Sequence, residues 1–241
     1  MASTTETGHA KNIANLRKLN EINGGFGGSY NPSNGLYVLA TMVGQHTNCN
    51  TLQEDVNAKE ATFKPVVNGR QIEFRTLKPL MRRVRTAAKT SGADDTWVAD
   101  VDTIVTKLLG ERQTKATPTE ADPAGTSGSQ QSFDNTINNF HKLIKLLGAE
   151  PLYAPNEVAL QVGTLTAKHG AMVVANNGVK AGAVPYNKAV IARNKALYTK
   201  KTGLVDCGQG SKDYVRSVFG FSSPEFKLVS KIEFRMLVKL K

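Results

Sequence analysis

Residues 152–157 read LYAPNE and residues 29–34 read SYNPSN, so Tyr, any residue, Pro and a small polar residue follow one another twice. A shift of 123 positions aligns the two stretches without a gap and also places His46 on His169. The shift is 124 just upstream and about 110 further downstream. Because residue order is kept along the whole alignment, we interpret the sequence as a tandem duplication.

Each copy carries the hydrophobic spacing of helices. Residues 132–148 read SFDNTINNFHKLIKLLG, with apolar side chains three and four positions apart, as on one face of a helix. Ser132 is a suitable N-cap for this helix and Gly148 a suitable stop. Further helices are predicted at residues 95–109 and 209–220. The sequence therefore predicts an all-α fold of two tandem helical-bundle repeats, each with three or four helices.

A long helical stretch follows each Tyr-x-Pro motif. We expect this stretch to begin at the motif itself, where Asn31, Ser33 or Asn156 can cap exposed backbone N–H groups. Pro is tolerated at a helix entrance because its missing N–H has no helical partner there. Tyr30 and Tyr153 are expected to pack the preceding loop against the bundle.

Potential helix breakers lie inside both stretches. They are Pro65, Asn68–Gly69 and Pro79 in the first copy, and Gly178, Gly182 and Pro185 in the second. An internal Pro costs about 3 kcal/mol, and an internal Gly costs about 1 kcal/mol. We therefore expect a turn or a strong kink in each copy. The alternative is one long kinked helix per copy.

The composition suggests where the repeats begin and end. A stretch rich in Thr, Ser, Gly, Pro and Gln, typical of a connector, separates the copies. The predicted organisation is a flexible N-terminus at 1–11, repeat 1 at 12–111, a linker at 112–131, repeat 2 at 132–222 and a basic C-terminal segment at 223–241. In that last segment Ile232, Phe234, Met236 and Val238 alternate with other residues. The segment is either an extended arm on the bundle, a short helix or an arm for another subunit.

Several further stretches carry a resemblance. They are ARNKALY at 192–198, TGLVD at 202–206, KDYVRSVFG at 212–220 and SPEFKLVSKIEF at 223–234. Together with the Tyr-x-Pro motifs, they resemble a family of duplicated all-helical proteins from bacteria of the Bacteroidota type. The resemblance covers most of the chain and implies a duplicated all-α fold. It carries no site residue over to this sequence.

The bulk composition excludes several classes of protein. Of the 241 residues, 40% are apolar and 21% are charged, which is typical of a globular domain and not of a disordered chain. No run of 18 apolar residues occurs, so we expect no membrane span. The N-terminus lacks a secretory signal, and two cysteines are too few for a disulfide framework. We therefore expect a cytoplasmic protein with reduced thiols.

The aligned histidines are the candidates for a metal site. Cys49 follows His46 by three residues, and Met172 follows His169 by three, so each copy places an imidazole beside a sulfur atom on one helix face. Such ligands suit copper or zinc. The alternative, which we favour, is that duplication passed on one ordinary surface or core-edge histidine. The neighbouring residues supply no carboxylate, so we predict no cofactor and no committed metal ligand.

The basic residues are the candidates for anion or nucleic-acid contacts. The chain has 31 basic and 20 acidic residues and a net charge of +11, which favours anionic partners. A helical face in the first copy and a cluster in the second carry the candidates: Lys78, Arg82, Arg85, Lys89, Arg193, Lys195, Lys200 and Lys201. Basic side chains on one face can neutralise phosphates. The alternative is that they are the solvated side of a helix.

The sequence carries no catalytic signature. The glycine-rich stretch GGFGG at 24–28 is not followed by the Lys-Ser/Thr of a phosphate loop, and no nucleophile elbow is present. We therefore expect a non-enzymatic structural, scaffold or binding protein. A nucleic-acid or polyanion binder is the second hypothesis, and a metal-binding protein that uses the histidines is the third. Self-association or another protein partner is compatible with the first hypothesis.

Overall fold

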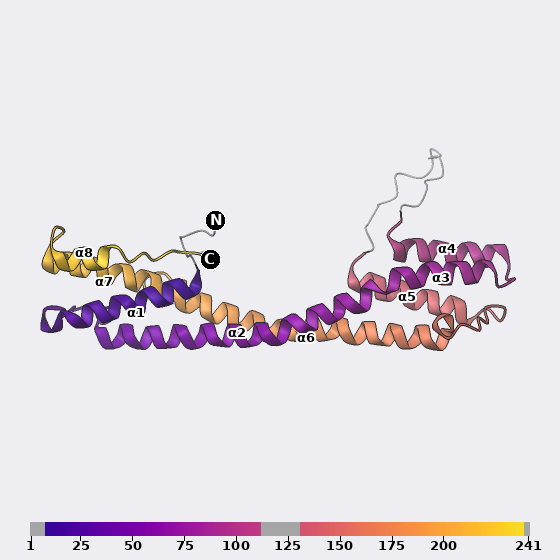
Figure 1. Cartoon of the computed structure of the whole chain (residues 1–241), viewed down its shortest axis with the longest axis horizontal. Helices are drawn as coiled ribbons and strands as arrows, with labels where there is room; N and C mark the ends of the chain where they lie inside the picture. Colours follow the sequence, from indigo (N-terminus) through magenta and orange to yellow (C-terminus); the bar gives the residue numbers. More distant parts are fainter. Residues whose placement is uncertain (1–7, 112–130, 239–241) are drawn as a thin grey trace, which may run out of the picture. The chain divides into compact units, whose positions relative to one another are not determined.

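The computed structural model describes residues 8–111 and 131–238, and every regular element within these ranges is a helix (Figure 1). The helices are α1 (His9–Gly25), α2 (Leu39–Arg75), α3 (Leu77–Lys89), α4 (Asp95–Leu109), α5 (Phe133–Gly148), α6 (Val162–Tyr198), α7 (Leu204–Phe219) and α8 (Pro224–Ser230), with short 3-10 helices η1 (Gly27–Ser29) and η2 (Val158–Leu160). The all-α prediction is therefore confirmed for the described residues. The first seven residues and nearly all of the predicted linker lie outside them.

Local capping explains several helix ends. The Ser132 hydroxyl accepts a hydrogen bond from the Asn135 N–H at 3.2 Å, and α5 ends at Gly148, as predicted. The Asp94 carboxylate accepts from the Thr96 N–H at 2.8 Å and so starts α4. Gly110 stops that helix with φ of 74°, a left-handed conformation that favours glycine. One predicted start was late, because α7 begins at Leu204 and the helix was expected from residue 209.

The Tyr-x-Pro motifs do not open the long helices, so the predicted caps at Asn31, Ser33 and Asn156 were wrong. The helices α2 and α6 begin only at Leu39 and Val162. The intervening residues form a compact loop, because each motif tyrosine folds it back onto its own backbone. Tyr30 donates to the Tyr37 carbonyl at 2.7 Å. Tyr153 donates to the Leu160 carbonyl at 3.0 Å. Both tyrosine side chains are buried, as predicted.

The predicted break is present in the first copy, at Thr76 between α2 and α3 and three residues before Pro79, whereas the second copy has none. Both α2 and α6 are continuous over 37 residues, with Pro65 inside the first and Pro185 inside the second. Both prolines are exposed, so water can bond the backbone carbonyl that each leaves without a partner. The two glycines of the second copy, Gly178 and Gly182, serve packing instead. A Cβ on Gly182 would lie 3.1 Å from the Phe63 ring, so the missing side chain allows α2 and α6 to approach closely within unit 2.

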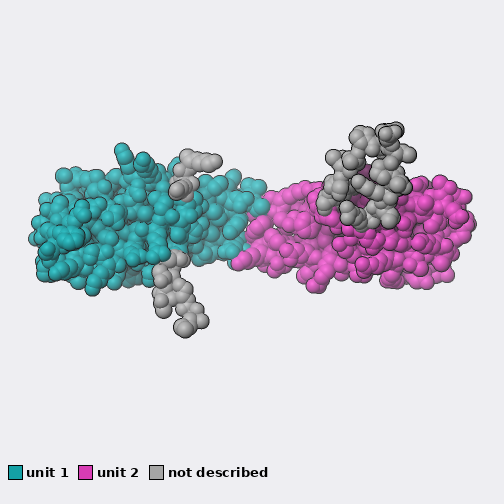
Figure 2. Space-filling model, turned by 90° about the horizontal axis from the view of Figure 1, so that it is seen from above, with its two compact units in different colours: residues 1–62, 183–241 teal, residues 63–182 magenta. Residues whose placement is uncertain are grey.

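The chain forms two compact units (Figure 2). Unit 1 comprises residues 1–62 and 183–241, and unit 2 comprises residues 63–182. Each unit therefore combines segments from both halves of the sequence, and the unit boundaries do not follow the predicted repeats at 12–111 and 132–222. Both long helices contribute residues to both units.

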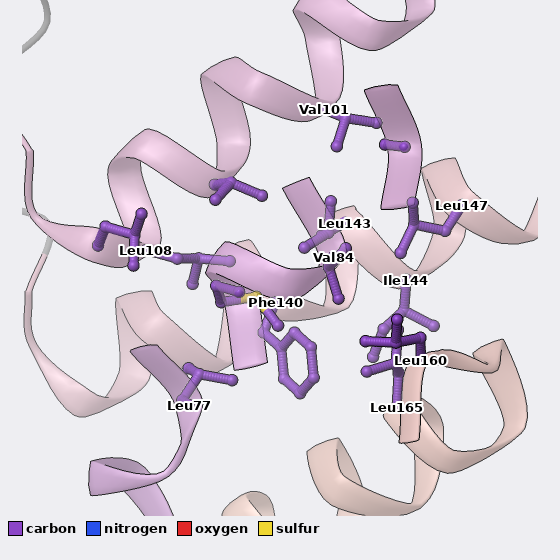
Figure 3. Close-up of a cluster of buried hydrophobic side chains, with 14 of the residues drawn as sticks. Leu77, Val84, Val101, Leu108, Phe140, Leu143, Ile144, Leu147, Leu160 and Leu165 are labelled. Atoms are coloured by element: carbon purple, nitrogen blue, oxygen red, sulfur yellow. The ribbon is translucent and has the colours of Figure 1, made fainter. Parts of the chain in front are cut away.

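Each unit has its own apolar core. In unit 2, side chains from α3, α4, α5, η2 and the start of α6 point toward one another (Figure 3). Phe140, Leu143 and Leu147 are completely buried there, which confirms the apolar face predicted for α5. In unit 1 the core contains Leu16, Leu19, Met42, Leu197, Leu204 and Val215.

The C-terminal segment has two parts. Residues 224–230 form α8, and residues 231–238, which we call the C-terminal arm, have no regular secondary structure. The arm contacts α1 and α7 of its own unit, with Ile232 buried in the unit 1 core. Among the alternatives left open by the sequence, the arm on the bundle is the one observed, preceded by a short helix.

Candidate functional site

Helix α3 places three of the predicted basic residues on an exposed surface of unit 2. Lys78, Arg82 and Lys89 are exposed, and the helix sequence contains no Asp or Glu. Exposed Arg83 extends the group around the helix. We call these four side chains the α3 basic face. Within the described part of the chain, none of them makes an ion pair, so their charges stay available to an anion.

Two other predicted arginines have structural roles instead. Arg85 forms ion pairs with Asp102 at 2.9 Å and with Glu111 at 3.0 Å, and so ties α3 to the middle of α4 and to the residue that follows its C-cap. Arg193 is only 8% exposed and donates to the Asn194 side-chain oxygen at 2.8 Å. Both guanidinium groups are therefore engaged within the fold, and neither belongs to a free basic surface.

The remaining predicted basic residues lie in unit 1. Lys195, Lys200 and Lys201 are exposed near the C-terminal end of α6 and in the loop that follows. The Lys201 backbone N–H donates to the Asp206 carboxylate at 2.7 Å. This carboxylate reduces the local positive potential around the loop, so the cluster is a weaker candidate than the α3 basic face.

A shallow groove adjoins the α3 basic face. It has a volume of about 350 Å³ and lies between the start of α3 and the region of η2 and α6. Its lining residues are Thr76, Pro79, Leu80, Arg83, Ala159, Thr164 and Lys168. Lys168 pairs with Glu73, whereas Arg83 makes no ion pair among the described residues. Sequence reasoning missed Arg83 and Lys168, and the Arg82–Arg83 pair was the signal that could have found the first.

The predicted histidine–sulfur pairs are separated by burial. Cys49 and Met172 are completely buried in the two cores, whereas His46 and His169 are partly exposed. Burial raises the pKa of Cys49 to about 11, with the nearby Cys207 thiol adding to the effect. Cys49 therefore stays a neutral thiol near pH 7, and a neutral thiol is a poor metal ligand.

His169 instead lies beside a histidine that was not among the candidates. Its ring centroid is 5.0 Å from that of His141 on α5. Burial lowers the pKa of His169, and His141 lowers it further, while a hydrogen bond to the Ile137 backbone opposes the shift. Within residues 8–111 and 131–238, no three His, Cys, Asp or Glu side chains converge as metal ligands.

The histidines should make stability depend on pH. Burial is the largest cause of a lowered pKa for His9, His46 and His169, whose ordinary value is 6.5. The unfolded chain then binds protons at a higher pH than the folded chain, so stability present above pH 6.5 is lost as the pH falls through the folded-state pKa values. Calorimetry should show a lower Tm at about pH 5.5 than at about pH 7.5. A His9→Gln/His46→Gln/His169→Gln variant should show a smaller difference, and an unchanged difference would contradict this assignment.

Neither a membrane span nor a match to known proteins indicates a function for this chain. No helix in the described part of the chain combines the length and apolar character needed to cross a membrane. No protein-family model, curated protein or solved structure matches the chain.

Proposed function

We propose that this chain is a non-enzymatic binding or scaffold protein that contacts a polyanion, such as nucleic acid, through the α3 basic face. The single observation that carries the proposal is the free charge of this face. Lys78, Arg82, Arg83 and Lys89 are exposed on one helix without a carboxylate partner in the described chain. Phosphate neutralisation requires free cations of this kind.

The cysteine thiols and the motif tyrosines have structural roles, which supports a binding role for the chain. Cys49 and Cys207 are buried, and burial raises the pKa of both thiols. The Tyr30 and Tyr153 hydroxyls bond backbone carbonyls. These groups thus contribute to packing and loop structure, while the basic residues of α3 face solvent.

We further propose that the two halves arose by duplication, in line with the resemblance to the Bacteroidota family. Equal helix lengths support this hypothesis, because α2 and α6 both have 37 residues and their first residues, Leu39 and Val162, are 123 positions apart. The tyrosine loops support it too, since Tyr30 and Tyr153 each bond a carbonyl seven residues further along. On this hypothesis each compact unit contains helices from both copies.

A salt titration tests the polyanion contact. The probes are a labelled 20-base-pair DNA duplex and a single-stranded RNA of the same length, followed by fluorescence anisotropy. Changing Lys78, Arg82, Arg83 and Lys89 to Gln should weaken binding. The slope of log K against log salt should fall by roughly 0.9 for each duplex phosphate contact that is lost. Failure of the unmodified protein to bind either probe at the lowest salt would refute the proposal.

A matched control distinguishes the effect of the α3 basic face from the effect of the total charge of the chain. Lys18, Lys142, Lys145 and Lys188 are exposed and make no ion pair among the described residues. Changing these four to Gln also removes four charges from +11, leaving +7 in both variants. The control should keep most of the salt slope of the unmodified protein. Equal losses in both variants would mean that net charge alone, and not the α3 basic face, causes the binding.

A further inference from the structure

Unit 2 brings two imidazole rings together from different helices. His141 lies on α5 and His169 on α6, and their ring centroids are 5.0 Å apart. The ring planes are tilted by 39°, so the rings are not stacked face to face. His141 is exposed and His169 is partly exposed. A small ion from solvent can therefore reach both rings.

The separation of the two rings fits two imidazoles on one metal ion. An imidazole nitrogen binds zinc at about 2 Å, which places the ion about 3 Å from the ring centroid. Two rings at a right angle or a tetrahedral angle around one ion then have centroids about 4.5–5 Å apart. The observed distance of 5.0 Å lies at this value. The helices α5 and α6 thus already hold the rings at the separation that a shared ion requires.

One ring nitrogen of His169 is already held by the backbone. Burial and His141 lower the pKa of His169, whereas a hydrogen bond to the Ile137 backbone raises it. Because that bond favours the protonated ring, a ring N–H is the donor and the Ile137 carbonyl is the acceptor. Histidines that bind metals generally donate one ring N–H to such a group, which leaves the other nitrogen for the ion. The ring also lies 6.1 Å from that of the buried Phe140, which limits its movement.

Unit 1 has a cation in the corresponding place. The shift of 123 positions places His46 on His169, and the upstream shift of 124 places Arg17 on His141. Burial lowers the pKa of His46, and the nearby Arg17 lowers it further. A guanidinium stays charged and offers no lone pair, so it repels a metal ion instead of binding it. The His46–Arg17 pair of unit 1 is therefore an internal control for the His141–His169 pair of unit 2.

We propose that His141 and His169 together bind one divalent transition-metal ion, which links α5 to α6. Imidazole suits copper, nickel and zinc, and Cu²⁺ is the ion of this group that nitrogen ligands bind most tightly. Two protein ligands do not complete the coordination shell, so water or an external ligand occupies the remaining positions. Both histidines lie outside the α3 basic face, so metal binding and polyanion binding can be tested separately.

Calorimetric titration of the full chain with Zn²⁺ at about pH 7.5, where an ordinary imidazole is neutral, tests this proposal. The unmodified chain should bind one ion. His141→Gln and His169→Gln should each weaken binding at least about tenfold, because either change leaves a single imidazole. His9→Gln/His46→Gln is the matched control and should bind Zn²⁺ like the unmodified chain. Mg²⁺, which requires oxygen ligands, should not bind at this pair.

Two further readouts distinguish chelation by the pair from separate weak binding at each ring. Zn²⁺ should raise the Tm of the unmodified chain, since an ion that needs both helices binds the folded state. It should not raise the Tm of either single variant. The electron paramagnetic resonance spectrum of the Cu²⁺ form should show nitrogen splitting that is lost in His141→Gln.

The His141→Gln variant decides the matter even if His169→Gln disturbs the packing around Phe140, because His141 is exposed. Circular dichroism of the metal-free variant confirms that it is folded. Unchanged Zn²⁺ binding in this variant would overturn the proposal, as would the loss of only half of the bound metal at saturation. No binding of Zn²⁺ or Cu²⁺ by the unmodified chain would overturn it as well.

Discussion

Changing Phe140 to Ala should lower the free energy of unfolding by about 3–5 kcal/mol, the range for deletion of a completely buried aromatic side chain. Phe140 lies on α5, has no exposed surface and belongs to the unit 2 core cluster, to which α3 and α6 also contribute side chains (Figure 3). Its ring also lies 6.1 Å from that of His169. Removing the ring leaves a cavity that the surrounding helices cannot fill without moving.

Denaturation in urea, followed by far-UV circular dichroism, measures this effect. Phe221 provides the matched control because it is the same residue type and 73% exposed. Phe221→Ala should change the free energy of unfolding by less than about 0.5 kcal/mol. Phe140→Leu, which keeps most of the volume, should lie between the two. If Phe140→Ala and Phe221→Ala had equal effects, the unit 2 core described here would be wrong.

The parts of the fold that depend on local chemistry could be predicted from the sequence. The spacing of Phe140, Leu143, Ile144 and Leu147 predicted the buried face of α5, and Ser132 predicted its start. The helix predicted at residues 95–109 has the same bounds as α4. In each case a few neighbouring residues determine the outcome, so no knowledge of the distant chain was needed.

The continuity of the long helices depends on the distant chain. Pro65 and Pro185 predicted breaks because an internal proline removes a helical hydrogen bond. Core contacts along the rest of each helix, such as those of Met42, Cys49 and Leu197, outweigh that cost, and their partners lie far away in the sequence. The sequence is ambiguous at Gly182 in the same way. A glycine there fits a break in the helix, and it equally fits a close contact between helices, such as the one with Phe63.

The sequence predicted only part of the α3 basic face, because here too the outcome depends on distant residues. Lys78, Arg82, Arg85 and Lys89 have helical spacing, and spacing alone cannot distinguish a free cation from a paired one. The partners of Arg85, Asp102 and Glu111, come from α4 and the residue beyond Gly110. Arg83 follows Arg82 directly and so does not share the helical spacing of the predicted residues. It lines the groove because η2 and α6 pack nearby and form the other side of it.

Changing Gly203 to Ala should destabilise unit 1 by about 3 kcal/mol, at the upper end of the cost of overpacking. Gly203 is the N-cap of α7 and is buried. A Cβ there would lie 2.6 Å from the Thr199 nitrogen, 2.7 Å from the Thr199 oxygen and 2.8 Å from the Leu197 oxygen. These are backbone atoms, so no side-chain rotation relieves the clash.

The loop around position 203 cannot move away from the added methyl group without losing hydrogen bonds and core contacts. The Gly203 N–H donates to the Thr199 carbonyl at 2.7 Å, and the flanking Leu197 and Leu204 are completely buried. Gly44→Ala is the matched control, since a Cβ at that position in α2 meets nothing within 4 Å. Ala has the better helix propensity, so this variant should be more stable by roughly 0.5–1 kcal/mol. Effects of opposite sign in thermal and urea denaturation would support the tight loop between α6 and α7, whereas a neutral or stabilising Gly203→Ala would exclude it.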